Sequence, residues 1–287
     1  MLQIAIIGDI HLHFDERDVA FFNQSPYDLI LCVGDLSNWR PRQGLPIARR
    51  LAQLAKPALF MPGNHDAVTA AQLLAEMKGW PRLERLFSWG QEWRVQRLQT
   101  ALGQVMWGGY RVHPFGDGVD GVTVISARPQ AMGGSDFSFS PYLARQYGIR
   151  SLAESAEKLK RCVDAAAHNR LIFLAHNGPT GLGSQAADIW GCDFLPQEGD
   201  FGDEDLRIAI EYARQKGKHV LAVIAGHMHH HLRNEQNRRW YLEREGIPYL
   251  NAARVPRIFH HNGSTWHHHI GLTLDGAIVQ VQEQLIH

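Results

Sequence analysis

Two histidines in the short stretch Gly226-His227-Met228-His229 are the first candidates for chemistry in this sequence. They directly follow residues 219–225, an apolar and β-branched-rich run that a glycine ends, which predicts a buried strand. Histidines two positions apart just past such a strand can direct both imidazoles into one cavity, where imidazole is a good ligand for Zn, Mn or Fe. Taken alone, the pair is equally consistent with surface loop histidines, since the chain contains 17 histidines.

Other polar side chains also follow short apolar runs. They lie in Asp9-Ile10-His11, Gly34-Asp35, Gly63-Asn64-His65-Asp66 and at His176. Singly, such residues cap helices, form turns or lie hydrogen-bonded in a core. Jointly they indicate one site, because independent accidents would not all fall at strand ends on one side of a sheet. The candidate metal ligands are therefore Asp9, His11, Asp35, Asn64, His176, His227 and His229.

This mixture of carboxylate, amide and imidazole ligands suits two divalent metal ions better than one. Seven ligands exceed the four of a tetrahedral site. A carboxylate can bridge two ions roughly 3.5–4 Å apart. Such a pair lowers the pKa of a bridging water, binds the oxygens of a phosphoryl group and offsets the charge that develops during in-line displacement. The residues therefore favour a metal-assisted reaction on a phosphoester.

The elements that must position these residues alternate in character. Residues 2–7, 28–33 and 58–61 are short apolar runs, and residues 15–22 and 45–54 between them have helical patterns. Alternation of this kind predicts a parallel sheet with helices packed outside it. Ligands in such folds collect at the carboxyl ends of the strands. Three of the candidate stretches are thus expected at one edge of one sheet.

The remainder of the chain predicts more of both element types. Residues 69–90 are expected to be helical with a break at Trp80-Pro81, and residues 93–126 to form short strands in an antiparallel part of a second sheet. Helices are expected over residues 151–167 and 203–216, strands over 170–175 and 219–225, and a hairpin at 273–279. The fold class is therefore α/β.

A long segment rich in Gly, Asp and Pro, residues 177–203, starts directly after His176. Segments of that length in compact domains are commonly lids or binding loops. The aromatic side chains Trp190, Phe194 and Phe201 can pack over a flat leaving group, or they can attach the segment to the body of the protein. The sequence leaves both alternatives open.

Length and composition exclude several classes of protein. The 287 residues can form one domain or two small ones, and with no linker or repeat visible we expect a single domain over residues 1–287. The formal net charge is zero, which argues against a non-specific nucleic-acid binder. Three scattered cysteines give no disulfide framework, and no apolar run approaches the roughly 18 residues of a membrane span. Without a basic leader, the chain is expected to be cytoplasmic and to have no membrane partner.

Five blocks together resemble the calcineurin-like metallophosphoesterases. They are Asp9-x-His11, Gly34-Asp35, Gly63-Asn64-His65-Asp66, His176 and Gly226-His227-x-His229, and they occur in the family's order over residues 8–229. The resemblance implies two mixed β-sheets sandwiched between helices, a four-layer αββα arrangement. Residues 251–257 also resemble an uncharacterised branch from cyanobacteria and plastids. Asn38 stands where the protein-phosphatase branch has an aspartate, which disfavours that branch.

The resemblance also implies roles for individual residues. One metal ion, Mn, Fe or Zn, would bind Asp9, His11, Asp35 and His229, and a second would bind Asp35, Asn64, His176 and His227, with Asp35 as the bridge. His65 would hydrogen-bond the substrate phosphoryl group and can protonate the leaving oxygen. Asp66 would either orient His65 or only support its loop.

The main hypothesis is a dinuclear phosphoesterase acting on a phosphomonoester or phosphodiester of a small molecule or nucleotide. A non-catalytic metal-binding scaffold is the first alternative, but it would be expected to lose a ligand or His65. A nuclease is the second, and long nucleic acid is disfavoured by the neutral net charge. Further side chains could bind phosphate or metal but are expected mainly on the surface or in the core: His230, His231, His267, His268, His269, Arg40, Arg42, Arg111 and Arg128.

Overall fold

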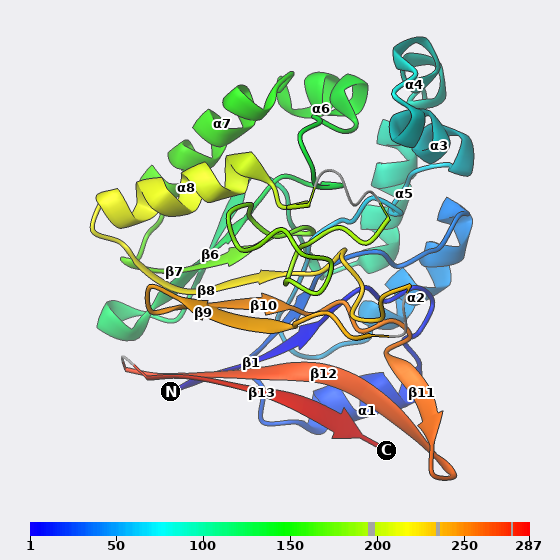
Figure 1. The fold of residues 1–287 in the computed structure, drawn as a ribbon. Coiled ribbons are helices and arrows are strands. Elements are labelled where there is room, and N and C mark those ends of the chain that lie inside the picture. The colour runs from blue at the N-terminus through cyan, green and yellow to red at the C-terminus, as the bar shows by residue number, and fades with distance from the viewer. Residues whose placement is uncertain (195–198, 234–235, 277) are drawn as a thin grey trace.

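Two mixed β-sheets face each other, and helices cover their outer faces (Figure 1). The computed structural model describes residues 1–194, 199–233, 236–276 and 278–287. An apolar cluster of buried residues that lie in strands of both sheets or directly after them, without a helix residue, fills the space between the sheets. The expected α/β class and the two-sheet sandwich are thus confirmed.

The first sheet has the strand order β11-β12-β1-β2-β3-β4, and β13 pairs with β12. Strands β1 to β4 run parallel, whereas β11, β12 and β13 pair antiparallel. The parallel arrangement of β1, β2 and β3 confirms the prediction from the alternating pattern. Its strands are β1 (Leu2–Ile7), β2 (Leu29–Cys32), β3 (Ala58–Phe60), β4 (Met106–Trp107), β11 (Ile258–His261), β12 (Ser264–Asp275) and β13 (Ile278–Ile286).

The second sheet has the order β5-β6-β7-β8-β10-β9. Strands β6, β7, β8 and β10 run parallel, and the edge strands β5 and β9 pair antiparallel with their neighbours. Its strands are β5 (Arg111–Phe115), β6 (Val122–Ser126), β7 (Arg170–Leu174), β8 (His219–Ala225), β9 (Tyr241–Arg244) and β10 (Ile247–Asn251). Both sheets therefore contain parallel central strands whose carboxyl ends can carry ligands.

The apolar runs in the central strands are continuous because both faces of each strand are buried. In β1, Ile4 and Ile6 pack into the cluster between the sheets, while Ala5 and Ile7 pack into the cluster that includes the helices. Side chains alternate between the two faces of a strand, so a strand covered on both sides needs apolar residues at every position.

Helices α1, α2, α5, α7 and α8 contribute to one large apolar cluster with residues of both sheets, and α7 and α8 lie along the second sheet (Figure 1). Side-chain caps begin several of them: Asp15 forms a capping box at α1, and Ser151 accepts from the Glu154 backbone N–H at α7. The helices are α1 (Glu16–Gln24), α2 (Gly44–Leu51), α3 (Ala70–Lys78), α4 (Pro81–Phe87), α5 (Gln91–Leu102), α6 (Ser140–Tyr147), α7 (Leu152–Asp164) and α8 (Glu204–Gln215), with 3₁₀ turns at Pro41–Gln43 and Gly118–Asp120.

Most predicted elements are confirmed. The break at Trp80-Pro81 separates α3 from α4, because Gly79 ends α3 in the left-handed conformation and Pro81 begins α4. The prediction of β-structure from residue 93 was wrong as far as residue 102, where α5 continues. Val95, Leu98 and Leu102 are its buried face at helical spacing, which outweighs the short apolar pieces that suggested strands. No helix within the described residues is long and apolar enough to cross a membrane.

Candidate metal centre

The candidate ligands lie at the carboxyl ends of strands from both sheets. Asp9 and His11 follow β1, Asp35 follows β2 and Asn64 follows β3 in the first sheet. His176 follows β7, and His227 and His229 follow β8 in the second sheet. The three stretches expected at one edge of one sheet do lie there, after β1, β2 and β3, and the second sheet supplies the other candidate ligands.

The first group consists of Asp9, His11 and His229, whose ligand atoms lie within 4.8 Å of one another. His229 Nε2 is 3.5 Å from Asp9 Oδ2 and 3.3 Å from His11 Nε2. The Asp9 carboxylate also accepts from the backbone N–H of His227, with both oxygens at 3.1 Å. A fully buried carboxylate thus fixes the start of the Gly-His-Met-His loop relative to β1.

The second group consists of Asp35, His176 and His227, again within 4.8 Å. Asn64 belongs with it: its Oδ1 lies 2.8 Å from His176 Nε2 and 3.0 Å from His227 Nδ1. All seven sequence-predicted ligands are therefore brought together, three in the first group and four around the second.

Asp35 lies between the two groups. Its Oδ2 is 3.6 Å from His11 Nε2 and 3.5 Å from His176 Nε2, so the same oxygen faces one imidazole of each group. Its Oδ1 accepts from the backbone N–H of His65 at 2.8 Å. This is the position that a bridging carboxylate requires.

The hydrogen bonds of two histidines leave ring nitrogens that suit metal ligation. His11 Nδ1 donates to the Ser37 carbonyl at 3.2 Å, and His176 Nδ1 donates to the Val33 carbonyl at 2.8 Å. In a neutral imidazole the other nitrogen then carries a lone pair. These lone pairs point at His229 Nε2 and at the Asn64 oxygen, so lone pairs and oxygens converge where a cation would bind.

Burial and the neighbouring carboxylates act in opposite directions on the pKa values of the candidate imidazoles. Burial, reinforced by His176, lowers the pKa of His227 to about 3, and burial also lowers the pKa of His11. Burial acts in the same direction on His176, but the carboxylates of Asp35 and Asp9 raise its pKa above the ordinary value. The carboxylates therefore generate a field that stabilises positive charge at this site. The donor set fits divalent metal ions.

The backbone around the centre tolerates only certain residues. A Cβ on Gly63 would lie 2.2 Å from Asp35 Oδ1, and one on Gly226 would lie 2.1 Å from Asp9 Oδ1. Three candidate ligands, His11, Asp35 and His227, have φ angles of 41°, 50° and 68°. Non-glycine residues in this left-handed region are strained, and such strain clusters at functional sites.

His65 is held with its Nε2 directed away from its anchoring bond. Its Nδ1 donates to the Asn38 carbonyl at 2.5 Å, and its ring packs edge-on against His11 and Trp39. Asp66 makes a different set of contacts: its carboxylate accepts from the backbone N–H groups of Asp35, Leu36 and Gly63. Of the two roles considered for Asp66, the geometry favours loop support, and the Asn38 carbonyl orients His65.

The remaining histidines of interest have structural partners. His230 is buried and bonds the Asn251 carbonyl at 2.8 Å, while His231 is exposed and lies 3.0 Å from Asn237. His267, His268 and His269 are buried in β12 and bond Asp18, Glu283 and Tyr27, respectively. These contacts agree with the expected core and surface roles.

The arginines divide into different environments. Arg128 is buried between Asp203 and Asp205, so it forms a structural ion-pair cluster, an outcome that the sequence did not indicate. Arg111 is exposed and donates only weakly, at 3.5 Å, to the Trp107 carbonyl. Arg40 and Arg42 line a groove beside His65.

The segment 177–203 is attached to the body by Trp190. That side chain is 1% exposed, donates from Nε1 to the Gly226 carbonyl at 3.2 Å and packs closely on Gly178. Phe201 is buried, and Phe194 packs against it edge-on. Trp190 is therefore part of the core, which favours attachment over a lid for the described part of this segment; residues 195–198 lie outside the described residues.

Two supporting residues were missed by sequence reasoning. Asn251 is buried and donates from Nδ2 to the Met228 carbonyl at 2.7 Å, and Arg238 donates from Nε to the His229 carbonyl at 3.0 Å. Both fix the backbone of the loop that carries His227 and His229. Asn251 is the last residue of β10, so a polar residue at the end of a sixth strand was an available signal, besides its place in the stretch 251–257.

Several solved structures resemble this chain at low sequence identity. A Staphylococcus aureus protein described as a 5′-nucleotidase shares 12% sequence identity with this chain, and the TM-score is 0.49. The match covers 99% of this chain and 54% of the Staphylococcus aureus chain. The Haemophilus influenzae NAD nucleotidase shares 12% identity, with 98% of this chain and 49% of the nucleotidase covered and a TM-score of 0.48. Chaetomium thermophilum Vps29 shares 8% identity, with 100% of this chain and 97% of Vps29 covered and a TM-score of 0.33. The chain spans about half the length of the first two. No curated protein sequence matches it significantly.

A sequence-family model gives the decisive comparison. The model described as calcineurin-like phosphoesterase matches residues 2–231, a span that includes every candidate ligand and both sheets' ligand-bearing strands. The chain belongs to the calcineurin-like phosphoesterase family.

Proposed function

We propose that this protein is a dinuclear metal-dependent phosphoesterase that hydrolyses a phosphomonoester or phosphodiester of a small molecule or nucleotide. The observation that carries the proposal is Asp35 Oδ2, which lies 3.6 Å from His11 Nε2 of one ligand group and 3.5 Å from His176 Nε2 of the other. One ion, Mn, Fe or Zn, would bind Asp9, His11, Asp35 and His229, and another would bind Asp35, Asn64, His176 and His227. Two bound divalent ions would supply a water-derived nucleophile and neutralise phosphoryl charge.

The chain's own residues would bind the substrate and move a proton. His65 contacts His11 of one ligand group and Asp35 of the other, and its Nδ1–H bond to the Asn38 carbonyl fixes the ring and leaves Nε2 free of that bond. Nε2 can donate to a phosphoryl oxygen and protonate the leaving oxygen. Asp66 positions this loop through its three backbone N–H bonds and touches no substrate.

Metal content and turnover together test the proposal. Protein loaded with manganese or zinc and then desalted should retain two ions per chain by elemental analysis. The manganese-loaded protein should hydrolyse at least one of a panel of phosphomonoesters, phosphodiesters and cyclic nucleotides. One ion or none at saturating metal would contradict the dinuclear centre. Two ions without turnover on any ester would instead support the non-catalytic scaffold.

A further inference from the structure

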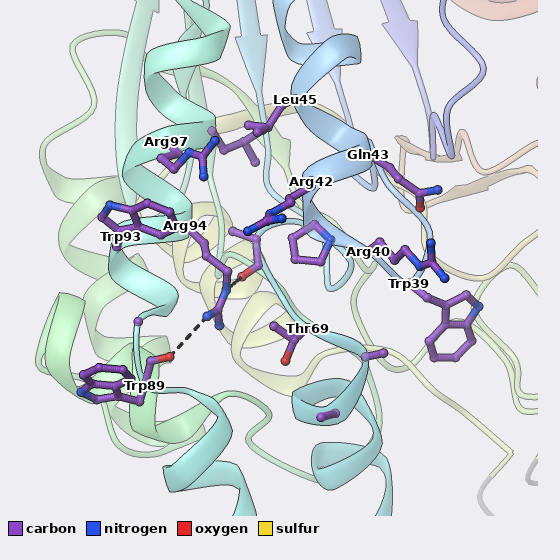
Figure 2. Close-up of a pocket in the computed structure, with 16 residues that line it drawn as sticks. Trp39, Arg40, Arg42, Gln43, Leu45, Thr69, Trp89, Trp93, Arg94 and Arg97 are labelled. Atoms are coloured by element: carbon purple, nitrogen blue, oxygen red, sulfur yellow. Dashed lines mark hydrogen bonds between the residues drawn. The ribbon is translucent and has the colours of Figure 1, made fainter.

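A groove of about 1000 Å³ (Figure 2) is lined in part by Trp39, whose ring contacts His65 beside the candidate metal centre. It is bounded by the 3₁₀ turn Pro41–Gln43, the start of α3 and the exposed face of α5. Within the described residues, its lining contains arginines and tryptophans and no carboxylate. Neither the metal ligands nor the attack on phosphorus accounts for this groove.

Two ring contacts connect the lining of the groove to the candidate centre. The His11 and His65 rings are 5.4 Å apart, and the His65 and Trp39 rings are 5.5 Å apart, both edge-on. Trp39 lines the groove at the end nearest the centre. A substrate whose phosphoryl group contacts His65 can therefore extend past Trp39 into the groove.

Four guanidinium groups make the groove cationic. Arg94 is half-buried and donates to the Ala67 carbonyl, the Trp89 carbonyl and Gln72 Oε1, all of which are neutral acceptors. Arg97 lies over the Trp93 ring at 4.7 Å, and Arg40 and Arg42 are exposed. None of the four has a carboxylate within salt-bridge distance among the residues that the structure covers. Their charges are thus available to an anion.

Three tryptophans are exposed on the same groove. Trp39 is 55% exposed, Trp93 57% and Trp89 84%. Figure 2 shows Trp39 on one side and Trp93 and Trp89 on the other, with Arg42 and Arg94 between them. Large apolar side chains gathered at one cationic hollow mark a binding surface better than scattered ones do. Flat indole faces beside guanidinium groups are suited to stack on a base while the arginines bind phosphate.

We propose that this groove binds the nucleotide part of a small substrate, with a base stacked on Trp93 or Trp39 and a second phosphate bound by Arg42 and Arg94. The proposal rests on the proposed function and deepens it: the substrate is a nucleotide that carries a phosphate in addition to the phosphoryl group attacked at the metals. A single nucleotide is of a size that sites of about 300–1,000 Å³ accommodate. The neutral net charge of the chain favours such a ligand over a long nucleic-acid strand.

Equilibrium binding to the manganese-loaded protein tests the groove. The three probes are the methylene-bridged analogue of ADP, octathymidylate and inorganic phosphate, the last of which has no base. Isothermal titration calorimetry gives the Kd of each probe. Arg42→Glu should weaken binding of the ADP analogue by about 10- to 100-fold. Trp93→Ala should weaken it by about tenfold and leave the Kd of inorganic phosphate unchanged.

Matched controls separate the groove from general effects. Arg49→Glu changes the net charge by the same amount as Arg42→Glu, but Arg49 is an exposed residue of α2 outside the groove. Trp80→Ala removes an exposed tryptophan that also lies outside the groove. Neither should change the Kd of the ADP analogue more than about twofold. If Arg42→Glu and Arg49→Glu changed the Kd of the ADP analogue equally, the proposal would be overturned. It would also be overturned if octathymidylate bound more tightly than the ADP analogue and its binding depended on Arg42 and Trp93.

Turnover distinguishes failure of this inference from failure of the proposed function. If the wild-type enzyme hydrolyses p-nitrophenyl phosphate and the groove variants bind the ADP analogue as wild type does, the groove assignment is wrong and the phosphoesterase stands. If wild type binds the analogue in a groove-dependent way but hydrolyses no ester, the nucleotide site stands and the proposed function fails.

Discussion

Asp35 links the parts of the candidate centre at the scale of single residues. One of its oxygens faces an imidazole of each ligand group, and the other accepts from the backbone N–H of His65. The Asp35 backbone is in the left-handed region, and the Asp66 carboxylate accepts from the backbone N–H groups of Asp35 and Gly63. Both features restrict where the Asp35 carboxylate can lie. Asp35 and His65 are therefore neighbours with separable tasks.

Asp35→Asn and His65→Ala should consequently have different effects. Asp35→Asn removes the bridging charge and should abolish both turnover and the retention of two ions. His65→Ala should keep the metal content of wild type and lower kcat by about 10²–10⁴-fold, the usual loss for a positioned acid. Elemental analysis and steady-state kinetics on an ester with a poor leaving group measure both. A His65→Ala enzyme with full turnover on that ester would remove His65 from the reaction.

Individual elements are joined to the site by buried polar contacts. Asp18 in α1 accepts from Arg257 Nη1 and Nη2 at 2.8 and 2.9 Å, and its Oδ1 lies 3.1 Å from His267 Nδ1 in β12. Asp15, Asp18 and His267 could hold a cation by spacing, but the Arg257 guanidinium already pairs with Asp18. We interpret this cluster as a structural connection between α1 and the first sheet.

The Asp18 cluster predicts a pH dependence of stability. Burial opposes ionisation of Asp18, but the Arg257 guanidinium and His267 hold its pKa well below the usual range. A depressed native pKa stabilises the fold above the unfolded pKa of about 3.9, and that contribution is lost as pH falls below it. Asp18→Asn should therefore cost about 3–5 kcal/mol of unfolding free energy near pH 7.

Urea unfolding in the presence of a chelator measures this difference for wild type and Asp18→Asn. The gap between the two proteins should narrow as pH falls from about 4 to about 3, because the wild-type carboxylate becomes protonated in the unfolded chain. A gap that stays constant over this range would show that Asp18 does not act through its charge.

The segment 177–203 gives a second prediction at the scale of elements. Trp190 is fully enclosed and donates to the carbonyl of Gly226, directly before His227. Trp190→Ala should lower the free energy of unfolding by about 3–5 kcal/mol, whereas Trp190→Phe keeps most of the packing and should cost less. Phe194, at 38% exposed, supplies the control, and Phe194→Ala should have a smaller effect than Trp190→Ala. Unchanged stability with an altered KM for Trp190→Ala would support a lid instead.

The whole molecule places its site where the two sheets meet. Ligands from β1, β2 and β3 face ligands from β7 and β8, so metal ions would connect the sheets as well as serve the reaction. Only a folded chain brings these groups within 4.8 Å, and a ligand that binds the folded state alone stabilises it.

Metal removal should therefore lower the melting temperature. At 100 times Kd, a bound ion stabilises by about 2.7 kcal/mol, which corresponds to about 5–10 °C for a chain of this size. Differential scanning calorimetry with and without chelator measures the shift. Asp35→Asn should melt at the same temperature in both conditions. If the chelator left the melting temperature of the wild-type protein unchanged, no ion would connect the sheets.

The sequence by itself predicted the candidate ligands, which the structure brings together, and most of the elements. Short apolar runs ending in Gly-Asp, Gly-Asn-His-Asp or Gly-His-Met-His mark the end of a buried strand and the polar side chains beyond it, and this information is local. The helical face of α5 was equally visible in the spacing of Val95, Leu98 and Leu102, but shorter strand-like pieces nearby obscured it.

Tertiary structure decided which side chains share a partner. The sequence cannot state that β7 and β8 belong to a different sheet from β1, because strand pairing joins residues far apart in the chain, such as Ile6 with Ile270. The sequence also could not show that Arg128 pairs with Asp203 and Asp205. Nor could it show that Asp66 accepts from three backbone N–H groups or that Trp190 lies in the core. Such contacts depend on burial and on long-range geometry, and a residue's type restricts its possible partners without selecting one.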